Sequence, residues 1–492
     1  MRTHFTEFKL RFVTNGRVST KHTIYKNLTT LESICTTPCA WAADLKYSVN
    51  MLQAQHPKAV NALHTLRATF YNETTFAHAT VGATSLRNLT MTNCLTTPNF
   101  DAIAQSPFLS TLETLRAEDC FYVVDLTLIA SMRNLTSLAL TGCHKIHSFK
   151  QLFGLTQLEH LTIKSARLLE GIPGFDAFIN LKTLSLHDMT PDELNDISIM
   201  TSLTSLTISN CGTNFDMPDL GALTSLTSLA WTNSIIPSGL AFLRKCTLLT
   251  SLTLSSYILV RSINHLSTLT SLTNLELDFR TETPLSCLTT LGALRHLGTH
   301  IHPITYPRHN TALTSFSNLV SLKIKDNTPG HLPLTTIQTP STLTSLSISK
   351  WTSFTSHGWD DFMTLQTLVF TDCPTITSLH PLAVLDELET LVLRRCESLV
   401  DLGGFEAQYS LTKLEVLDCK GLVSARGCQD MQILTHLSLR GCTYVTHLGH
   451  TLTTKPLRFL DITNCDRLLV CVHDLRKPNL TVVGDNRIES DE

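Results

Sequence analysis

Charged residues are scarce in this sequence. Lys, Arg, Asp and Glu make up 16% of the 492 residues, against about 25% in average soluble proteins. Hydrophobic residues make up 42%, which excludes intrinsic disorder, because disorder combines low hydrophobicity with high net charge. The net charge is -3, so bulk charge does not attract polyanions. The 15 cysteines are too few for a miniprotein held together by disulfides.

Long apolar runs are also lacking. No stretch approaches the roughly 18 consecutive apolar residues of a transmembrane helix, and the N-terminus lacks the apolar core of a signal peptide. The first thirty residues do carry six basic side chains and one acid, Glu7. Such a segment resembles a mitochondrial targeting leader over residues 1–25. The alternative is an edge strand, because Phe8, Leu10 and Phe12 alternate with Lys9 and Arg11.

Recognisable catalytic motifs are missing as well. The sequence contains no phosphate-binding loop, dinucleotide-binding glycine turn, nucleophile elbow or H-E-x-x-H pair. We therefore expect no enzymatic activity, and assign no catalytic, cofactor-binding or metal-binding residue.

An internal repeat dominates what is present. The frame Leu-x-x-Leu-x-φ-x-x-(Cys or other), where φ is apolar, recurs eighteen times with spacings of 22–26 residues, most often 23. SLTSLTISNC (202–211), TLQTLVFTDC (364–373) and ILTHLSLRGC (433–442) are examples. We number the first leucine position one. It is occupied by Leu63, Leu86, Leu112, Leu135, Leu158, Leu181, Leu203, Leu226, Leu249, Leu272, Leu294, Leu319, Leu343, Leu365, Leu388, Leu411, Leu434 and Leu457, and we expect a nineteenth unit from Leu480.

This pattern resembles the leucine-rich repeat (LRR) superfamily with short repeats, over roughly residues 60–485. The resemblance implies an α/β LRR solenoid, with a parallel β-sheet on the concave face and turns and short 3-10 or helical pieces on the convex face. We expect residues 63–484 to form the solenoid of 18–19 repeats, because one unit cannot bury its apolar face alone. Residues 1–62 are expected to cap it, with a helix at 39–55, and 485–492 to form an acidic tail.

Cysteine follows the same register. Position nine holds Cys94, Cys120, Cys143, Cys211, Cys373, Cys396, Cys419, Cys442 and Cys465. In leucine-rich repeats this slot is a buried ladder whose side chains donate to carbonyl groups, so a structural role is favoured over metal or redox chemistry. So many buried thiols indicate a reducing compartment. Cys35 and Cys39 fall outside these frames, and a zinc site there would need two more ligands.

Candidate partner contacts lie where the repeat is irregular. Thr299 replaces the apolar residue at position six, and the segment 305–311 is a candidate protruding loop. The alternative there is a plain insertion. For the basic spots elsewhere, a solvated mixed surface is favoured over nucleic-acid contact, and Glu276 and Asp278 form a separate acidic spot. The candidate contacts are His296, His300, Tyr306, Arg308, His309, Arg394, Arg395, Lys413 and Arg440.

The two histidines of the strand at 296–300 do not form a convincing metal site. They are four residues apart along a strand, about 13 Å between backbones, which is too far to share one ion easily. The concave face in the middle repeats is instead a neutral surface of hydroxyl groups, with neither the aromatic platforms nor the basic stripe of a nucleic-acid-binding surface. Its outward positions include Ser205, Thr207, Ser209, Ser228, Ala230, Thr232, Ser251, Thr253 and Ser255.

These observations favour a non-enzymatic scaffold for protein–protein interaction, as a stable subunit of a large intracellular assembly, because interface cores are depleted in charge. A mitochondrial ribosome or other ribonucleoprotein is a concrete candidate if the basic leader is a mitochondrial address. The alternative is a substrate-recognition module of a ubiquitin-ligase or immune-type sensor system. We expect protein partners, at most minor RNA contact, no membrane, no small-molecule substrate and no cofactor. We expect a reducing compartment, the mitochondrial matrix or the cytosol.

Overall fold

The computed structural model describes residues 35–36, 64–69, 84–92, 103–104, 106–146, 148–165, 177–188, 195–211, 220–236, 240–281, 283–300, 313–325, 339–352, 354, 358–404, 409–428, 431–448, 456–468 and 479–484. The chain divides into two compact units. The first comprises Met1–Ile235 and Phe242–Leu249, and the second Ile236–Ala241 and Thr250–Glu492. In the described residues, no helix combines the length and apolar character needed to cross a membrane.

Each of the eighteen predicted frames contains a β-strand that starts at position three. In the first unit the strands are β2 (Thr65–Thr69), β3 (Asn88–Thr92), β4 (Thr114–Glu118), β5 (Ser137–Thr141), β6 (His160–Lys164), β7 (Thr183–His187), β8 (Ser205–Ser209) and β9 (Ser228–Thr232), preceded by β1 (Cys35–Thr36). In the second unit they are β10 (Ser251–Ser255), β11 (Asn274–Asp278), β12 (His296–His300), β13 (Ser321–Lys325), β14 (Ser345–Ser349), β15 (Thr367–Thr371), β16 (Thr390–Arg394), β17 (Lys413–Leu417), β18 (His436–Ser438), β19 (Phe459–Asp461) and β20 (Thr481–Val483).

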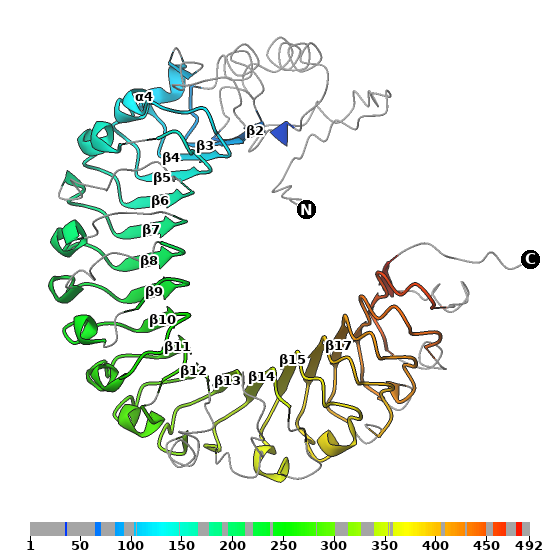
Figure 1. Cartoon of the computed structure of the whole chain (residues 1–492). Coiled ribbons are helices and arrows are strands. Elements are labelled where there is room, and N and C mark those ends of the chain that lie inside the picture. The colour runs from blue at the N-terminus through cyan, green and yellow to red at the C-terminus, as the bar shows by residue number, and fades with distance from the viewer. Residues whose placement is uncertain are drawn as a thin grey trace, which may run out of the picture. The chain divides into compact units, whose positions relative to one another are not determined.

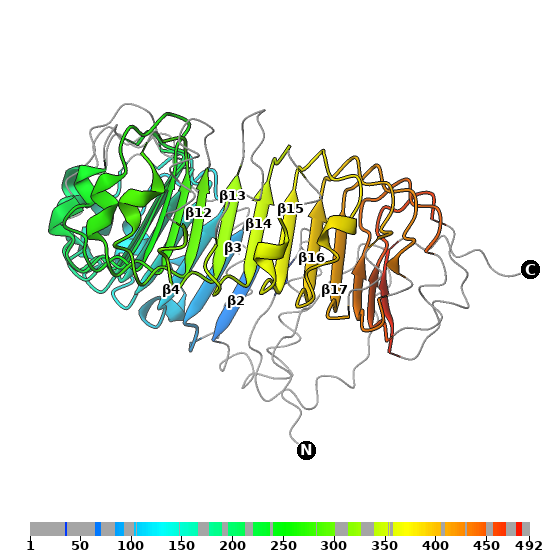
Figure 2. The same cartoon turned by 90° about the horizontal axis from the view of Figure 1, so that it is seen from below.

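The strands are parallel and in register within each unit. Leucine stands beside leucine at position four, for example Leu206 beside Leu229 in the first unit and Leu252 beside Leu275 in the second. Figure 2 shows β12 to β17 side by side in this arrangement. Side chains alternate along a strand, so positions four and six are buried and positions three, five and seven face outward in most of the strands. We call the outward side the strand face.

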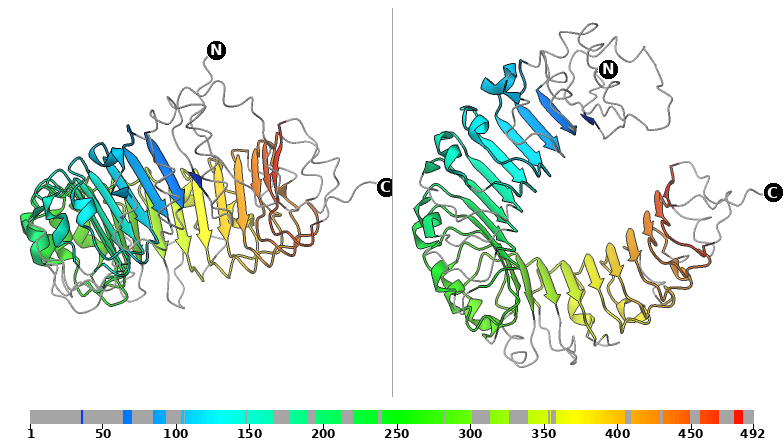
Figure 3. Two further views of the ribbon diagram at one scale, coloured as in Figure 1. Left: turned by 90° about the horizontal axis from the view of Figure 1, so that it is seen from above. Right: turned by 45° about the horizontal axis from the view of Figure 1, so that its top comes forward.

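The segments that return from one strand to the next contain short helical turns, as expected for this fold. In both units they lie on the side away from the strand face (Figures 1 and 3). These turns are η3 (Pro107–Ser110), α4 (Thr127–Ala130), η4 (Lys150–Gly154), η6 (Asn195–Ile199), η7 (Leu220–Ala222), η8 (Ala241–Leu243), η9 (Asn264–Thr268), η10 (Leu285–Leu288), η12 (Asp360–Phe362) and η13 (His380–Leu382). The fold is therefore a leucine-rich-repeat solenoid in each unit.

Side-chain hydroxyl groups join successive repeats at two fixed positions. A threonine at position two donates to the position-two carbonyl of the preceding repeat, as Thr227 does to Thr204 at 3.1 Å and Thr273 to Thr250 at 3.0 Å. The hydroxyl of the residue before position one likewise donates to the carbonyl of the first leucine in the preceding repeat, as Thr364 does to Leu343 at 2.8 Å. Part of the Ser and Thr content is thus architectural.

Position eight, directly after each strand, has a left-handed backbone in most repeats. Its φ angle is positive at Asp119, Ser165, Asp188, Asn210, Asn233, Lys350, Asp372, Arg395, Asp418 and Asn464, and at Gly142 and Gly441. Asp, Asn and Gly are the residues that adopt this conformation most readily. The turn reverses the alternation of the strand, so the cysteine at position nine points inward.

The strand register revises two details at the ends of the repeat array. Val482 of β20 stands beside Leu460, so the nineteenth frame starts at residue 479, one residue before the predicted Leu480. Cys35 of β1 stands beside Arg67, which is position five. Counting back from Cys35 gives a further frame with residue 31 as its first position, whereas the leucine pattern leaves Cys35 outside the repeat. Cys39 lies outside the described residues. Three predicted segments lie outside the described residues: the leader at 1–25, the helix at 39–55 and the tail at 485–492.

Candidate functional site

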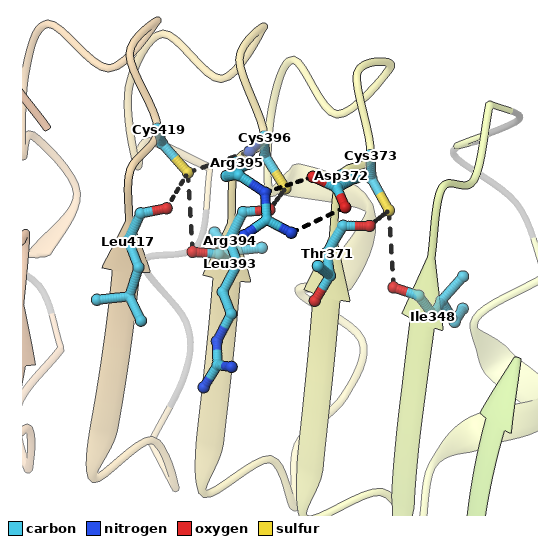
Figure 4. Close-up of polar contacts among 10 residues, drawn as sticks. All are labelled: Ile348, Thr371, Asp372, Cys373, Leu393, Arg394, Arg395, Cys396, Leu417 and Cys419. Atoms are coloured by element: carbon cyan, nitrogen blue, oxygen red, sulfur yellow. Dashed lines mark hydrogen bonds and ion pairs between the residues drawn. The ribbon is translucent and has the colours of Figure 1, made fainter. Parts of the chain in front are cut away.

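The ladder cysteines are thiols that bond to backbone carbonyl groups at strand ends. All eight that the structure describes are thiols outside any disulfide, and seven are buried, with Cys465 partly accessible. Sγ of Cys373 donates to the Ile348 carbonyl of the preceding repeat at 3.7 Å and to Thr371 at 3.4 Å, and Cys419 bonds in the same way to Leu393 and Leu417 (Figure 4). Cys94 lies outside the described residues.

The thiol of Cys373 is poorly suited to chemistry. Burial raises the pKa of the Cys373 thiol to about 11, and the thiolate is the form that attacks and that binds metals. Among the residues that the structure describes, no three His, Cys, Asp or Glu side chains are placed to hold a metal ion. The ladder contributes packing and weak hydrogen bonds instead.

A cluster of charge occupies the strand face of the second unit. It lies at the carboxyl ends of β11 to β15, in a hollow of about 240 Å³. We call it the charged hollow. Its polar lining consists of Glu276, Asp278, Gly298, Thr299, His300, Lys323, Lys325, Ser349, Lys350, Thr371 and Asp372.

Two ion pairs in this hollow pass over strand β12. Lys323 on β13 bonds to Glu276 on β11, and Nζ of Lys325 lies 2.8 Å from Oδ1 of Asp278. Each pair joins the same position of two strands that are not neighbours, roughly 10 Å apart at the usual strand spacing. Gly298 makes room for the first pair, because a Cβ atom there would lie 3.1 Å from Cγ of Glu276.

His300 lies beneath the second pair. Its Nε2 atom bonds to Oδ1 of Asp278, and 8% of its side chain is exposed. Burial lowers the pKa of His300, and the hydrogen bond to Asp278 only partly opposes this. Burial would raise the pKa of Asp278, but the hydrogen bonds from Lys325 and His300 outweigh it and lower that pKa. Asp278 is therefore a carboxylate held between two donors.

The predicted basic spots lie further along the second unit. Arg394 is exposed on the strand face, whereas Arg395, at position eight, forms a bidentate pair with Asp372, with NH2 at 2.9 Å from Oδ2 (Figure 4). The hydrogen bond from Arg395 lowers the pKa of Asp372. Lys413 pairs with Glu415 at 2.8 Å on the same strand, and Arg440 is exposed.

The predicted contact residues differ in exposure. His296, Arg394 and Arg440 are exposed. Arg395 is exposed but paired with Asp372, and Lys413 is half-buried beside Glu415. His300 is almost covered, so a partner would meet the ion pair above it more than the imidazole. Tyr306, Arg308 and His309 lie outside the described residues.

The pairing of the acidic and basic spots was missed in the sequence. Glu276 and Lys323 both stand at position five, and Asp278 and Lys325 both stand at position seven, two repeats apart. Equal frame positions lie in rows across the sheet, so this signal was available. The missing element was Gly298, whose lack of a side chain lets the outer residues meet.

Comparison with solved structures agrees with this fold. An internalin from Listeria monocytogenes matches with a TM-score of 0.50 and 17% identity, covering 66% of this chain and 94% of that one. An LRR protein from Leptospira interrogans matches with a TM-score of 0.53 and 18% identity, covering 76% of this chain and 94% of that one. No protein-family model and no curated sequence matches the chain. At these identities the likeness concerns the fold alone.

Proposed function

We propose that this chain is a non-enzymatic interaction scaffold that holds a protein partner against its strand face. The supporting observation is the charged hollow, where acidic and basic side chains are gathered between strands β10 and β14, whose own outward side chains are half-exposed Ser and Thr. Exposed ion pairs contribute little to stability, about 0–1 kcal/mol each, so a partner can exchange them for its own charges at little cost. Ordered charges of both signs favour specificity over bulk attraction.

Within this proposal the chain is a stable subunit of a larger intracellular assembly. The low charge of the surface supports lasting burial, since interface cores are depleted in charged residues. The eleven cysteines whose side chains the structure describes are all thiols, which supports a reducing compartment, either the mitochondrial matrix or the cytosol. A mitochondrial ribosome or another ribonucleoprotein remains the concrete candidate, and it depends on the basic leader.

The test is purification of the tagged full-length chain from the cells that produce it, followed by sizing and cross-linking mass spectrometry. We expect elution well above the 54.6 kDa monomer, with cross-links from Lys323, Lys325 or Lys350 to a partner protein. Elution as a monomer without any partner would contradict the proposal.

A charge exchange separates partner binding from folding. Lys323→Glu leaves two acidic side chains together, whereas the double variant Glu276→Lys, Lys323→Glu restores an internal ion pair with reversed polarity. If the hollow binds the partner, both variants should lose it while the double variant keeps the thermal stability of the wild type. Retention of the partner by both variants would exclude the hollow from the interface.

A further inference from the structure

The strands β10 and β11 end differently from most other strands of the chain. Ser256 and Phe279, at position eight, are not among the residues with a positive φ angle. Without the left-handed turn, the inward–outward alternation of the strand continues for two more residues. Ser256 and Phe279 are accordingly buried, with 8% and 3% exposure, and position nine points outward.

Three consecutive apolar side chains are exposed as a result. Tyr257 is 84% exposed, Ile258 41% and Leu259 44%. We call them the apolar triplet. In repeats that keep the turn, position nine is buried in most cases, as at Cys373, Ser234 and Trp351, which are at most 4% exposed. Contiguous exposed apolar residues mark interaction sites, and tyrosine is among the residues that dominate binding energy.

A backbone contact joins the residue after the apolar triplet to the next repeat, and two exposed arginines lie at this contact. The N–H group of Val260, which is buried, donates to the Arg280 carbonyl at 2.9 Å. Val260 also forms a parallel bridge with Thr281. This pairing puts the backbone of Arg280 beside that of Leu259. Arg261 follows Val260, and both arginine side chains are exposed.

We propose that the apolar triplet, with Arg280 and Arg261, is a docking site for a partner-protein segment that carries apolar side chains next to carboxylates. This inference rests on the proposed scaffold function and adds a second, separate contact to it. The cationic border selects an acidic segment by charge complementarity. Base stacking on RNA is less favoured, because successive bases need several aromatic platforms and the triplet has one.

The probe is a fluorescent peptide in which leucine and tryptophan alternate with aspartate, measured by anisotropy against the full-length protein. We expect binding that weakens at least tenfold when the aspartates become lysines. Tyr257→Ser combined with Leu259→Ser should cause a similar loss, and Arg280→Glu a smaller one. The matched control is Tyr409→Ser, which removes another tyrosine that is 73% exposed and should leave binding and melting temperature unchanged.

Equal binding of the aspartate and lysine peptides, or no effect of the Tyr257 and Leu259 changes, would overturn the site. So would tighter, Tyr257-dependent binding of a single-stranded RNA oligonucleotide, or a Tyr257-dependent dimer on a sizing column. Retention of the purified partner by a variant that has lost the triplet overturns only this inference. A wild-type chain that purifies alone overturns the scaffold proposal instead, whatever the peptide result.

Discussion

At the scale of the residue, the φ angle at position eight decides whether the side chain at position nine is buried or exposed. Where φ is positive, the following residue, most often a cysteine, is buried in most repeats; after Ser256, where φ is not positive, Tyr257 points to solvent. Lys350 and Arg395 adopt the left-handed conformation without being Asn, Asp or Gly. For such side chains this costs roughly 1–2 kcal/mol, so the neighbouring repeats must hold them in place.

Gly441 offers a test of this backbone requirement. Its φ angle is +76°, and a Cβ atom would lie 2.1 Å from Oδ1 of Asp418. We expect Gly441→Ala to lower the free energy of unfolding by about 1–2 kcal/mol, measured by urea denaturation. Gly292→Ala is the control, because a Cβ atom at Gly292 would meet no described atom within 4 Å beyond its chain neighbours, and it should not destabilise. Equal stability of both variants would contradict the strain at position eight.

At the scale of the element, the short strands are joined by more than their backbone hydrogen bonds. The Thr250 carbonyl accepts the N–H groups of Thr273 and Asn274 and also the Thr273 hydroxyl. The same threonine bridge recurs at Thr136, Thr204, Thr227, Thr412 and Thr435. A hydroxyl that serves this bridge is not evidence of a partner. The scarcity of charged side chains therefore supports a partner-binding surface only at positions three, five and seven, where the Ser and Thr side chains are half-exposed and serve no such bridge.

Replacement of Thr273 by valine isolates one such bridge, because valine keeps the shape and the strand preference of threonine. We expect a loss of about 0.5–1 kcal/mol in the free energy of unfolding. Thr253→Val, on the strand face of β10, should change it by less than about 0.5 kcal/mol. Chemical denaturation of both proteins provides the measurement. A larger effect at Thr253 than at Thr273 would reject the bridge as a stabilising contact.

At the scale of the whole molecule, stability comes from repeats that each contact their neighbours. Each buried leucine contributes about 1.5–3 kcal/mol when it leaves water, and the thiols are enclosed in the same core. Of the eleven cysteines whose side chains the structure describes, nine are buried, while Cys287 and Cys465 are partly accessible. Burial raises the pKa of the Cys287 thiol to about 11 as well.

Thiol titration tests this enclosure. In the native protein at neutral pH, at least nine thiols should react slowly with Ellman's reagent, because they are buried and mostly protonated. In denaturant without reductant, all fifteen should react if the chain resides in a reducing compartment. Rapid reaction of most thiols in the native protein would contradict the buried ladder. A denatured count well below fifteen would contradict the compartment.

The repeat made most of the fold predictable. Eighteen leucine frames place eighteen strands, because a period repeated so often leaves one register in which every apolar face is covered. The ends were less certain, because the frames at 479 and 31 lack the second leucine. Strand pairing moves the predicted nineteenth frame by one residue and adds the frame at 31. Of the residues lining the charged hollow, only His300 was among the predicted contacts, and the ion pairs that join its walls follow from contacts between strands.

The amino-acid order alone is enough to define which side chains of each repeat face the core, since burial of leucine in a regular register is a local periodic property. Long-range packing decided the rest. Lys323 reaches Glu276 because Gly298 leaves the space between them empty, and the pKa of Asp278 is lowered because His300 and Lys325 both bond to it. Tyr257 is exposed because the chain omits one left-handed turn. These outcomes depend on neighbouring strands and on single backbone angles, which the periodicity of a sequence does not specify.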